Sequence, residues 1–76
     1  MGVRATLIEK MAQLCALDPA TIRDDAWLIE YGLDSVRSLE LVVLLESHFD
    51  IELSETEIGT IVTVGDLIRM LERQME

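Results

Sequence analysis

The residues with the clearest chemical potential occupy positions 32–36, Gly-Leu-Asp-Ser-Val, where Ser35 stands at the start of a long apolar helical pattern. A nucleophilic serine needs a general base within hydrogen-bond reach. His48 is the only histidine, and it lies thirteen residues further along the same expected helix. At a rise of about 1.5 Å per residue, the two positions are roughly 20 Å apart. A Ser–His dyad is therefore not expected, a small hydrolase is disfavoured, and we do not expect an enzyme.

Two other roles are open to Ser35. Either Asp34 or Ser35 can act as the N-cap of the following helix, because both side chains accept hydrogen bonds from the first free amides. Alternatively, a phosphate on Ser35 would lie at a helix N-terminus, where free N–H groups and the helix dipole favour an anion. Gly32 allows a close approach to this helix start, and Asp34 places a carboxylate beside the hydroxyl. Position alone leaves capping and modification both open.

The rest of the chain offers no metal or phosphate site. One cysteine and one histidine are too few for a structural zinc site, and the pattern of a calcium-binding loop is absent. The four glycines are dispersed, so none forms a glycine-rich phosphate loop. Cys15, the only cysteine, lies on the apolar side of the first expected helix, where a free cysteine packs as a small hydrophobic residue. We expect neither a metal site nor a disulfide.

The formal charge of −9 is unevenly distributed. Residues 18–66 hold twelve acids and only two bases, Arg23 and Arg37, which gives that segment a net charge of −10. Such a field repels nucleic acid and anionic membranes, and it attracts proteins with basic docking patches. The alternative is that the acidity only keeps a small protein in solution.

Length and composition indicate one small domain over residues 1–76. Half of the residues are hydrophobic but only three are aromatic, so aliphatic side chains must fill the core. Charged residues interrupt the N-terminal apolar stretch, and the longest apolar run, residues 41–45, is far too short to span a bilayer. We expect a cytoplasmic protein with no membrane partner.

Apolar spacing predicts an all-α fold, a small four-helix bundle with three longer helices and one short helix. The longer helices are expected at about residues 3–16, 36–48 and 64–74, and the short one after Ser54, which begins a capping-box pattern. The long connection 17–34 should include a short helical turn from Thr21. It should lie across the bundle and anchor its four large apolar side chains, Ile22, Trp27, Leu28 and Leu33.

Two of the longer helices carry apolar sets whose inward direction can be predicted. The inward stripe of the second is expected to contain Val36, Leu39, Val42, Val43 and Phe49, widened by Leu41, Leu44 and Leu45. The last helix is expected to direct Val64, Leu67, Ile68, Leu71 and Met75 inward. The second helix is apolar around so much of its circumference that some apolar residues should be left for a partner.

Several motifs follow one another from the start of the second helix onward. They are Asp34-Ser35-Val36, Glu40-Leu41-Val42 with Glu46, Phe49-Asp50-Ile51-Glu52-Leu53, and Thr63-Val64-Gly65-Asp66-Leu67. In this order the sequence resembles the acyl carrier protein family over nearly its whole length. Residues 34–36 stand in the position of that family's Asp-Ser-Leu attachment motif.

The resemblance implies a cofactor, a cargo and a set of partners. Ser35, preceded by the motif acid Asp34, would carry 4′-phosphopantetheine, transferred from coenzyme A by a separate phosphopantetheinyl transferase. The thiol of that arm would hold an acyl group as a thioester, so the carrier itself needs no catalytic residues. An acyltransferase or adenylating enzyme would load the arm, and a downstream synthase or transferase would use the cargo. The chain is expected to be a monomer.

The resemblance also implies a docking surface on the second helix and the preceding loop. Val36 and Val43 stand where the family exposes apolar contacts, although core packing is the alternative for Val43. The family exposes acids at the positions of Asp34, Glu40, Glu46 and Glu55. Arg37 departs from the pattern, because fatty-acid carriers have an acid there, and we expect it to influence the choice of partner.

Further departures bear on the pathway. Ser47 and His48 replace two more acids of the fatty-acid carriers, and Ser54 replaces a common proline. Residues 28–37 resemble aryl and aminoacyl carriers of nonribosomal peptide pathways, and the part from residue 39 onward resembles polyketide carriers. We predict a free-standing carrier of an acyl or aminoacyl group in a specialised polyketide or hybrid pathway. The alternatives are an aryl or peptidyl carrier, a primary fatty-acid carrier, or an acidic helical interaction module without a prosthetic group.

Overall fold

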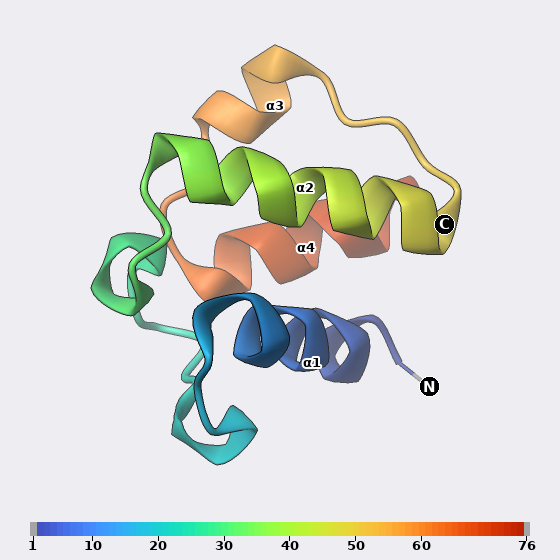
Figure 1. Ribbon diagram of the computed structural model, residues 1–76. Coiled ribbons are helices and arrows are strands. Elements are labelled where there is room, and N and C mark those ends of the chain that lie inside the picture. Colours follow the sequence, from blue (N-terminus) through green and yellow to red (C-terminus); the bar gives the residue numbers. More distant parts are fainter. Residues whose placement is uncertain (1, 76) are drawn as a thin grey trace.

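The computed structural model describes residues 2–75, in which the regular structure is helical apart from one isolated β-bridge (Figure 1). The elements are α1 (Val3–Cys15), η1 (Pro19–Thr21), η2 (Leu28–Tyr31), α2 (Ser35–Phe49), α3 (Glu55–Gly59) and α4 (Val64–Gln74), of which η1 and η2 are short 3-10 helices. The predicted all-α architecture of three longer helices and one short helix is confirmed. None of the helices within residues 2–75 is both long and apolar enough to cross a membrane.

The helix boundaries follow from capping residues that the sequence displays. Thr63 and Asp66 form a complete capping box at the start of α4, with each side chain accepting from the other residue's backbone N–H. Ser54 Oγ accepts from Glu57 N at 3.1 Å and starts α3. The Glu57 carboxylate instead accepts from Gln74 Nε2 at 3.0 Å, so this box is only half formed and the glutamate links α3 to α4.

The connection between α1 and α2 lies across the bundle, as predicted, but differs in two details. Its first helical turn is Pro19–Thr21, capped by the Asp18 side chain, so the turn ends rather than begins at Thr21. Ile22, Leu28 and Leu33 are buried. The expectation that Trp27 is buried was wrong, because 57% of its surface is exposed. Its backbone bridges to Thr63 while its indole ring remains largely in solvent.

Backbone hydrogen bonds join this connection to the start of α4. Leu28 N donates to Val62 O at 2.9 Å, Val64 N to Ala26 O at 3.1 Å, and Gly65 N to Asp24 O at 2.8 Å. Gly65 permits the last contact, since a β-carbon there would lie 3.2 Å from the Asp24 oxygen. The segment that leads into α2 is therefore held by the residue before Thr63 and by the first turn of α4.

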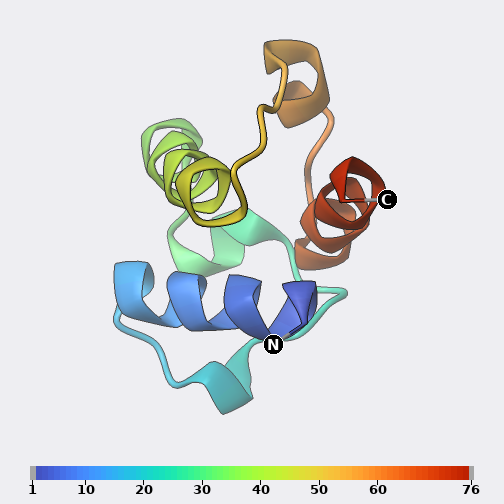
Figure 2. The ribbon, with the colours of Figure 1, turned by 90° about the vertical axis from the view of Figure 1, so that its right-hand side faces the viewer.

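The core lies between α1, α2 and α4, with α3 above the space between α2 and α4 (Figure 2). Its fully buried side chains are Leu7, Met11, Leu41, Leu45, Val64, Leu67 and Leu71. Each such side chain contributes about 1.5–3 kcal/mol by leaving water.

The inward face of α2 differs from the predicted stripe. The buried side chains are Leu41, Val42 and Leu45, whereas Val36, Leu39 and Val43 are more than half exposed. In α4, Val64, Leu67, Ile68 and Leu71 point inward as predicted and Met70 joins them, but Met75 is 48% exposed. Met75 is the C-cap of α4, beyond the last turn that packs on the core.

Candidate functional site at the start of α2

At the start of α2, the residue that caps the helix is the one before Ser35. Asp34 is the N-cap, and its Oδ1 accepts a hydrogen bond from Arg37 N at 3.0 Å. Ser35 is the first residue of the helix and is exposed. The helix therefore begins one residue earlier than predicted, and the capping role belongs to Asp34. The Ser35 hydroxyl is not needed for capping.

The turn before α2 holds the backbone that leads to Ser35 in place. Gly32 ends η2 with φ of +82°, in the left-handed region that favours glycine. The chain reverses there and buries Leu33, whose carbonyl oxygen accepts from Ser38 Oγ at 3.1 Å. Ser35 thus stands on an anchored turn with a buried leucine two residues before it.

A cavity of about 380 Å³ opens beside Ser35, between α2, α3 and the preceding loop. Most of its lining is apolar, and Asp34, Ser35 and Ser38 are its only polar side chains. Its aliphatic lining is formed by Leu28, Ile29, Leu33, Leu39, Leu41, Val42, Ile58, Ile61 and Leu67. Gly59 adds no side chain on the α3 side, and a β-carbon there would meet nothing within 4 Å. The cavity is suited to an uncharged apolar group attached near Ser35.

Arg37 is directed toward α1. Its Nη1 donates to the carbonyl oxygen of Leu14 at 2.9 Å, in the last turn of α1. The guanidinium also lies near Cys15, where it opposes the effect of burial. Burial is the larger effect and raises the pKa of the Cys15 thiol above its ordinary value. This cysteine is accordingly a thiol rather than a thiolate at neutral pH.

The residues predicted to dock partners lie in different surroundings. Val36 (66% exposed), Glu40 and Val43 (61% exposed) share the outer face of α2, so Val43 is not a core residue. Glu46 is half-buried, and its Oε2 accepts from Leu53 N at 2.8 Å, which ties it to the loop after α2. Glu55 is exposed at the first position of α3.

Sequence reasoning did not identify three other residues of the outer surface, namely Leu14, Leu39 and Leu44. Together with Val36, Glu40 and Val43 they line a shallow groove. The available signal was the excess of apolar residues around α2, which indicated unburied side chains without showing which ones. His48 lies in the last turn of α2, at the opposite end from Ser35, with its ring edge-on to Phe49.

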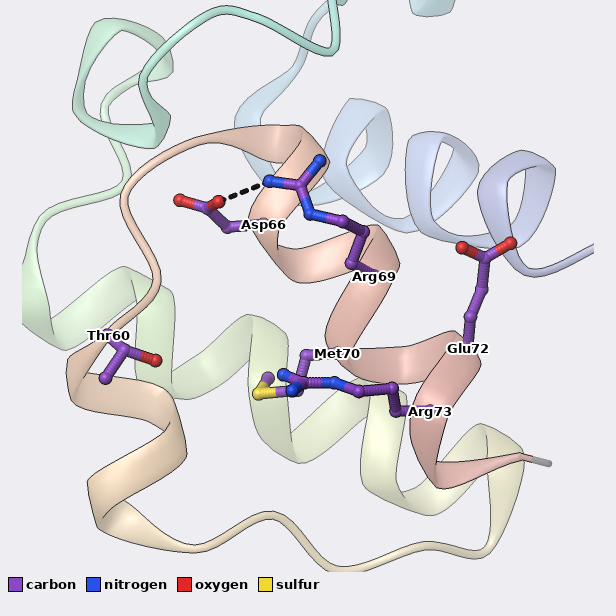
Figure 3. Close-up of a pocket in the computed structure, with 6 residues that line it drawn as sticks. All are labelled: Thr60, Asp66, Arg69, Met70, Glu72 and Arg73. Carbon is purple, nitrogen blue, oxygen red and sulfur yellow. Dashed lines mark hydrogen bonds and ion pairs between the residues drawn. The ribbon is translucent and has the colours of Figure 1, made fainter.

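A second hollow, of about 390 Å³, lies along α4 (Figure 3) and shares no lining residue with the cavity beside Ser35. It is lined by Thr60, Asp66, Arg69, Met70, Glu72 and Arg73. Arg69 Nη2 donates to Asp66 Oδ1 at 2.6 Å, so the charged pair within it is already formed. Hydrogen bonds from the backbone of Thr63, and then of Val62, lower the pKa of Asp66. Of the residues that line this hollow, Asp66 is therefore engaged in the capping box of α4.

The comparisons with known proteins agree with this geometry. Residues 5–71 match the family model described as a phosphopantetheine attachment site. The chain is 35% identical to the acyl carrier protein of Sulfurovum, over 84% of this chain and 87% of that protein. It is 32% identical to the acyl carrier protein of Wolinella succinogenes, over 95% of this chain and 96% of that protein. It is also similar to part of a non-reducing polyketide synthase of Emericella nidulans, with 34% identity over 86% of this chain but 2% of that protein. The crystal structure of an acyl carrier protein from Thermotoga maritima superposes with a TM-score of 0.83 at 27% identity, covering 93% of this chain and 84% of that one.

Proposed function

The chain belongs to the acyl carrier proteins, which have a phosphopantetheine attachment site, and from that membership we propose that Ser35 is the residue that carries the arm. The protein is a carrier rather than a catalyst. It holds an acyl group on covalently bound 4′-phosphopantetheine, whose terminal thiol forms the thioester. The observation that supports Ser35 is its exposed hydroxyl at the first position of α2, beside a cap that Asp34 provides alone.

The start of α2 fits a phosphodiester. The first amides of a helix have no intrahelical acceptor, and Asp34 takes only that of Arg37. The amides before Arg37 and the positive end of the helix dipole therefore favour an anion on Ser35. The chain contributes the Ser35 oxygen and this anion-favouring helix start, and the separate transferase supplies the catalytic groups. The apolar cavity next to Ser35 then offers the acyl group a place out of water.

The experiment that tests Ser35 is a mass measurement. Unmodified protein is incubated with coenzyme A and a broad-specificity phosphopantetheinyl transferase, and its intact mass is compared before and after. We expect a gain of one phosphopantetheine group in the parent chain and none in Ser35→Ala. Ser38→Ala is the matched control, since it removes a half-buried hydroxyl one turn further along α2 and should leave the gain unchanged. A gain that persists in Ser35→Ala would refute the assignment. An unmodified parent chain with intact function would favour an interaction module.

We further propose that the carrier serves a specialised pathway of the polyketide or hybrid type. Four residues depart from the pattern expected of fatty-acid carriers, namely Arg37, Ser47, His48 and Ser54. The similarity to part of a fungal polyketide synthase supports the polyketide type of pathway. Its partners would be the transferase, a loading acyltransferase or adenylating enzyme, and a downstream synthase. The arm-bearing protein should accept an acyl group from acyl-coenzyme A through a polyketide acyltransferase. Loading only by an ATP-dependent adenylating enzyme would support the aryl or peptidyl carrier instead.

A further inference from the structure

The hydroxyl group of Tyr31 joins the two halves of the connection between α1 and α2. Its oxygen accepts a hydrogen bond from Arg23 N at 3.0 Å and donates to the carbonyl oxygen of Thr21 at a longer 3.4 Å. The ring is half-buried and packs against the core. Figure 1 shows the connection on the left of the view, where it runs from the end of α1 to the start of α2. Tyr31 therefore closes residues 21–31 into one loop, shortly before Ser35.

Tyr31 is also the last residue of η2, and the turn that leads to Ser35 is built on that helix. Leu33 N donates to Leu28 O in η2 at 3.3 Å, and Leu33 O accepts from Ser38 Oγ in α2 at 3.1 Å. Through Leu33, η2 and the first turn of α2 form one hydrogen-bonded unit. The position of Ser35 relative to the bundle consequently depends on how firmly η2 is held.

Contacts outside η2 hold that helix at both ends. At its start, Leu28 N donates to Val62 O at 2.9 Å, which joins η2 to the segment before α4. At its end, the Tyr31 hydroxyl provides the contact. A 3-10 helix of four residues gains little from its own hydrogen bonds, whose geometry is poor, so outside contacts of this kind determine its orientation. Removing the hydroxyl would release the end of η2 that is nearer to Ser35 in the chain.

We propose that Tyr31 is a positioning residue for the attachment reaction, because its hydroxyl holds the turn that presents Ser35 to the transferase. The inference rests on the carrier function proposed above. In the reaction the Ser35 oxygen forms a bond to phosphorus as the nucleotide part of coenzyme A leaves, and the hydroxyl proton passes to the transferase. A misplacement of a reacting atom by about 1 Å can lower a rate by about a hundredfold. Tyr31 acts through the turn and not on the reacting atoms.

The first test compares attachment kinetics in the full unmodified chain and in Tyr31→Phe, with coenzyme A and a broad-specificity phosphopantetheinyl transferase. Tyr31→Phe keeps the ring and removes both hydrogen bonds of the hydroxyl. The rate of mass gain should give a kcat lower by about three- to tenfold, the factor that corresponds to one intramolecular hydrogen bond. KM for the carrier should stay within about twofold of the parent value, because the surface that contacts the transferase is unchanged.

Thr21→Val is the matched control. It removes a hydroxyl from the same connection, where Thr21 Oγ1 donates to Asp18 O at 2.7 Å, but leaves the Tyr31 contacts in place. Both kcat and KM should stay within about twofold of the parent values. Urea denaturation of each variant establishes that it is folded under the assay conditions.

Amide NMR spectra of the unmodified chain test the positioning role without the transferase. In Tyr31→Phe the amide signals of Gly32, Leu33 and Ser35 should shift or broaden, because the turn exchanges between positions once η2 is released. Signals from the middle of α4 should keep their positions and widths, and Thr21→Val should leave the signals of the turn unchanged. A role of Tyr31 in overall stability alone would not move the signals of the turn selectively.

Several outcomes would overturn the proposal. Equal kcat in the parent chain and Tyr31→Phe would do so, as would an equal loss in Thr21→Val or unchanged signals of the turn in Tyr31→Phe. A higher KM with an unchanged kcat would make Tyr31 a contact of the transferase, which also contradicts a positioning role. No mass gain in the parent chain refutes the Ser35 assignment and this inference together, whereas a normal rate of mass gain in Tyr31→Phe refutes the role of Tyr31 alone.

Discussion

Arg37 Nη1 donates a hydrogen bond to the carbonyl oxygen of Leu14 at 2.9 Å, and so joins the first turn of α2 to the last turn of α1. The last carbonyls of a helix have no intrahelical donor and lie at the negative end of its dipole, where a cation is favourable. The backbone N–H of Arg37 meanwhile binds the Asp34 cap at 3.0 Å. One residue thereby contributes to both the cap of α2 and its connection to α1.

We predict that Arg37→Gln lowers the free energy of unfolding by about 0.5–1.5 kcal/mol, through the lost charge-assisted hydrogen bond. Arg37→Lys should lose less, because it keeps a cation near the end of α1. Arg37→Glu should lose most, since a carboxylate would face the carbonyl end of the helix. Urea denaturation followed by circular dichroism measures all three. Equal stability of the parent chain and Arg37→Glu would contradict a structural role and return Arg37 to partner recognition.

Replacing the cap residue and replacing the proposed attachment residue should lower the free energy of unfolding by different amounts. Asp34→Ala removes the side chain that accepts from Arg37 N and should cost about 0.5–2 kcal/mol. Ser35→Ala should cost less than Asp34→Ala, because the Ser35 hydroxyl does not cap the helix. Chemical denaturation of the two unmodified variants under the same conditions provides the comparison. A larger loss in Ser35→Ala than in Asp34→Ala would show that the serine is the cap.

Local signals in the sequence predicted the helix ends well. Ser54 starts α3 as its capping-box pattern indicated, and Thr63 and Asp66 cap α4, since a cap depends on residues within one turn. The start of α2 was ambiguous by one residue, because Asp34 and Ser35 are both good caps. Only backbone geometry distinguishes them: Asp34 is extended while Ser35 is already helical.

Features that depend on distant contacts were predicted less well. The apolar residues of α2 cover so much of the helix that periodicity cannot select the inward side, which is chosen by packing of Leu41 and Leu45 within the core. Trp27 was expected inside because its side chain is large and apolar, yet its backbone bridges to Thr63 while 57% of its surface stays exposed. Glu46, which is predicted to dock partners, also accepts a hydrogen bond from a loop amide seven residues away, and the sequence did not indicate this contact.

Two glycines should respond in opposite directions to alanine. Gly32→Ala places a β-carbon at φ of +82° and should cost about 1–2 kcal/mol, the usual penalty of the left-handed region. Gly59→Ala lies in α3 with open space around the added carbon, and should stabilise by up to about 0.5–1 kcal/mol through helix propensity. Urea midpoints of the two variants provide the test. A destabilised Gly59→Ala would indicate that the cavity-facing part of α3 needs glycine for another reason.

Asp66 should make the stability of the bundle depend on pH. Its Oδ2 accepts from Thr63 N at 3.0 Å and from Val62 N at 3.1 Å, and these hydrogen bonds lower its pKa from the ordinary value of 3.8. A carboxyl whose pKa is lower in the folded state stabilises that state above its unfolded pKa. This contribution is lost as the pH falls through the folded pKa.

We therefore expect Asp66→Asn to be less stable than the parent chain at pH 7, by an amount that shrinks as the pH falls below about 4. Urea denaturation at several pH values measures the difference. Glu52→Gln is the matched control, because it removes one exposed acid from the loop after α2 without removing a cap. It should be neutral or slightly stabilising at pH 7, since it reduces the repulsion within a chain of net charge −9. A deficit of Asp66→Asn that is constant from pH 7 to pH 3 would show that the amide simply packs poorly, and that the charge on Asp66 does not stabilise the start of α4.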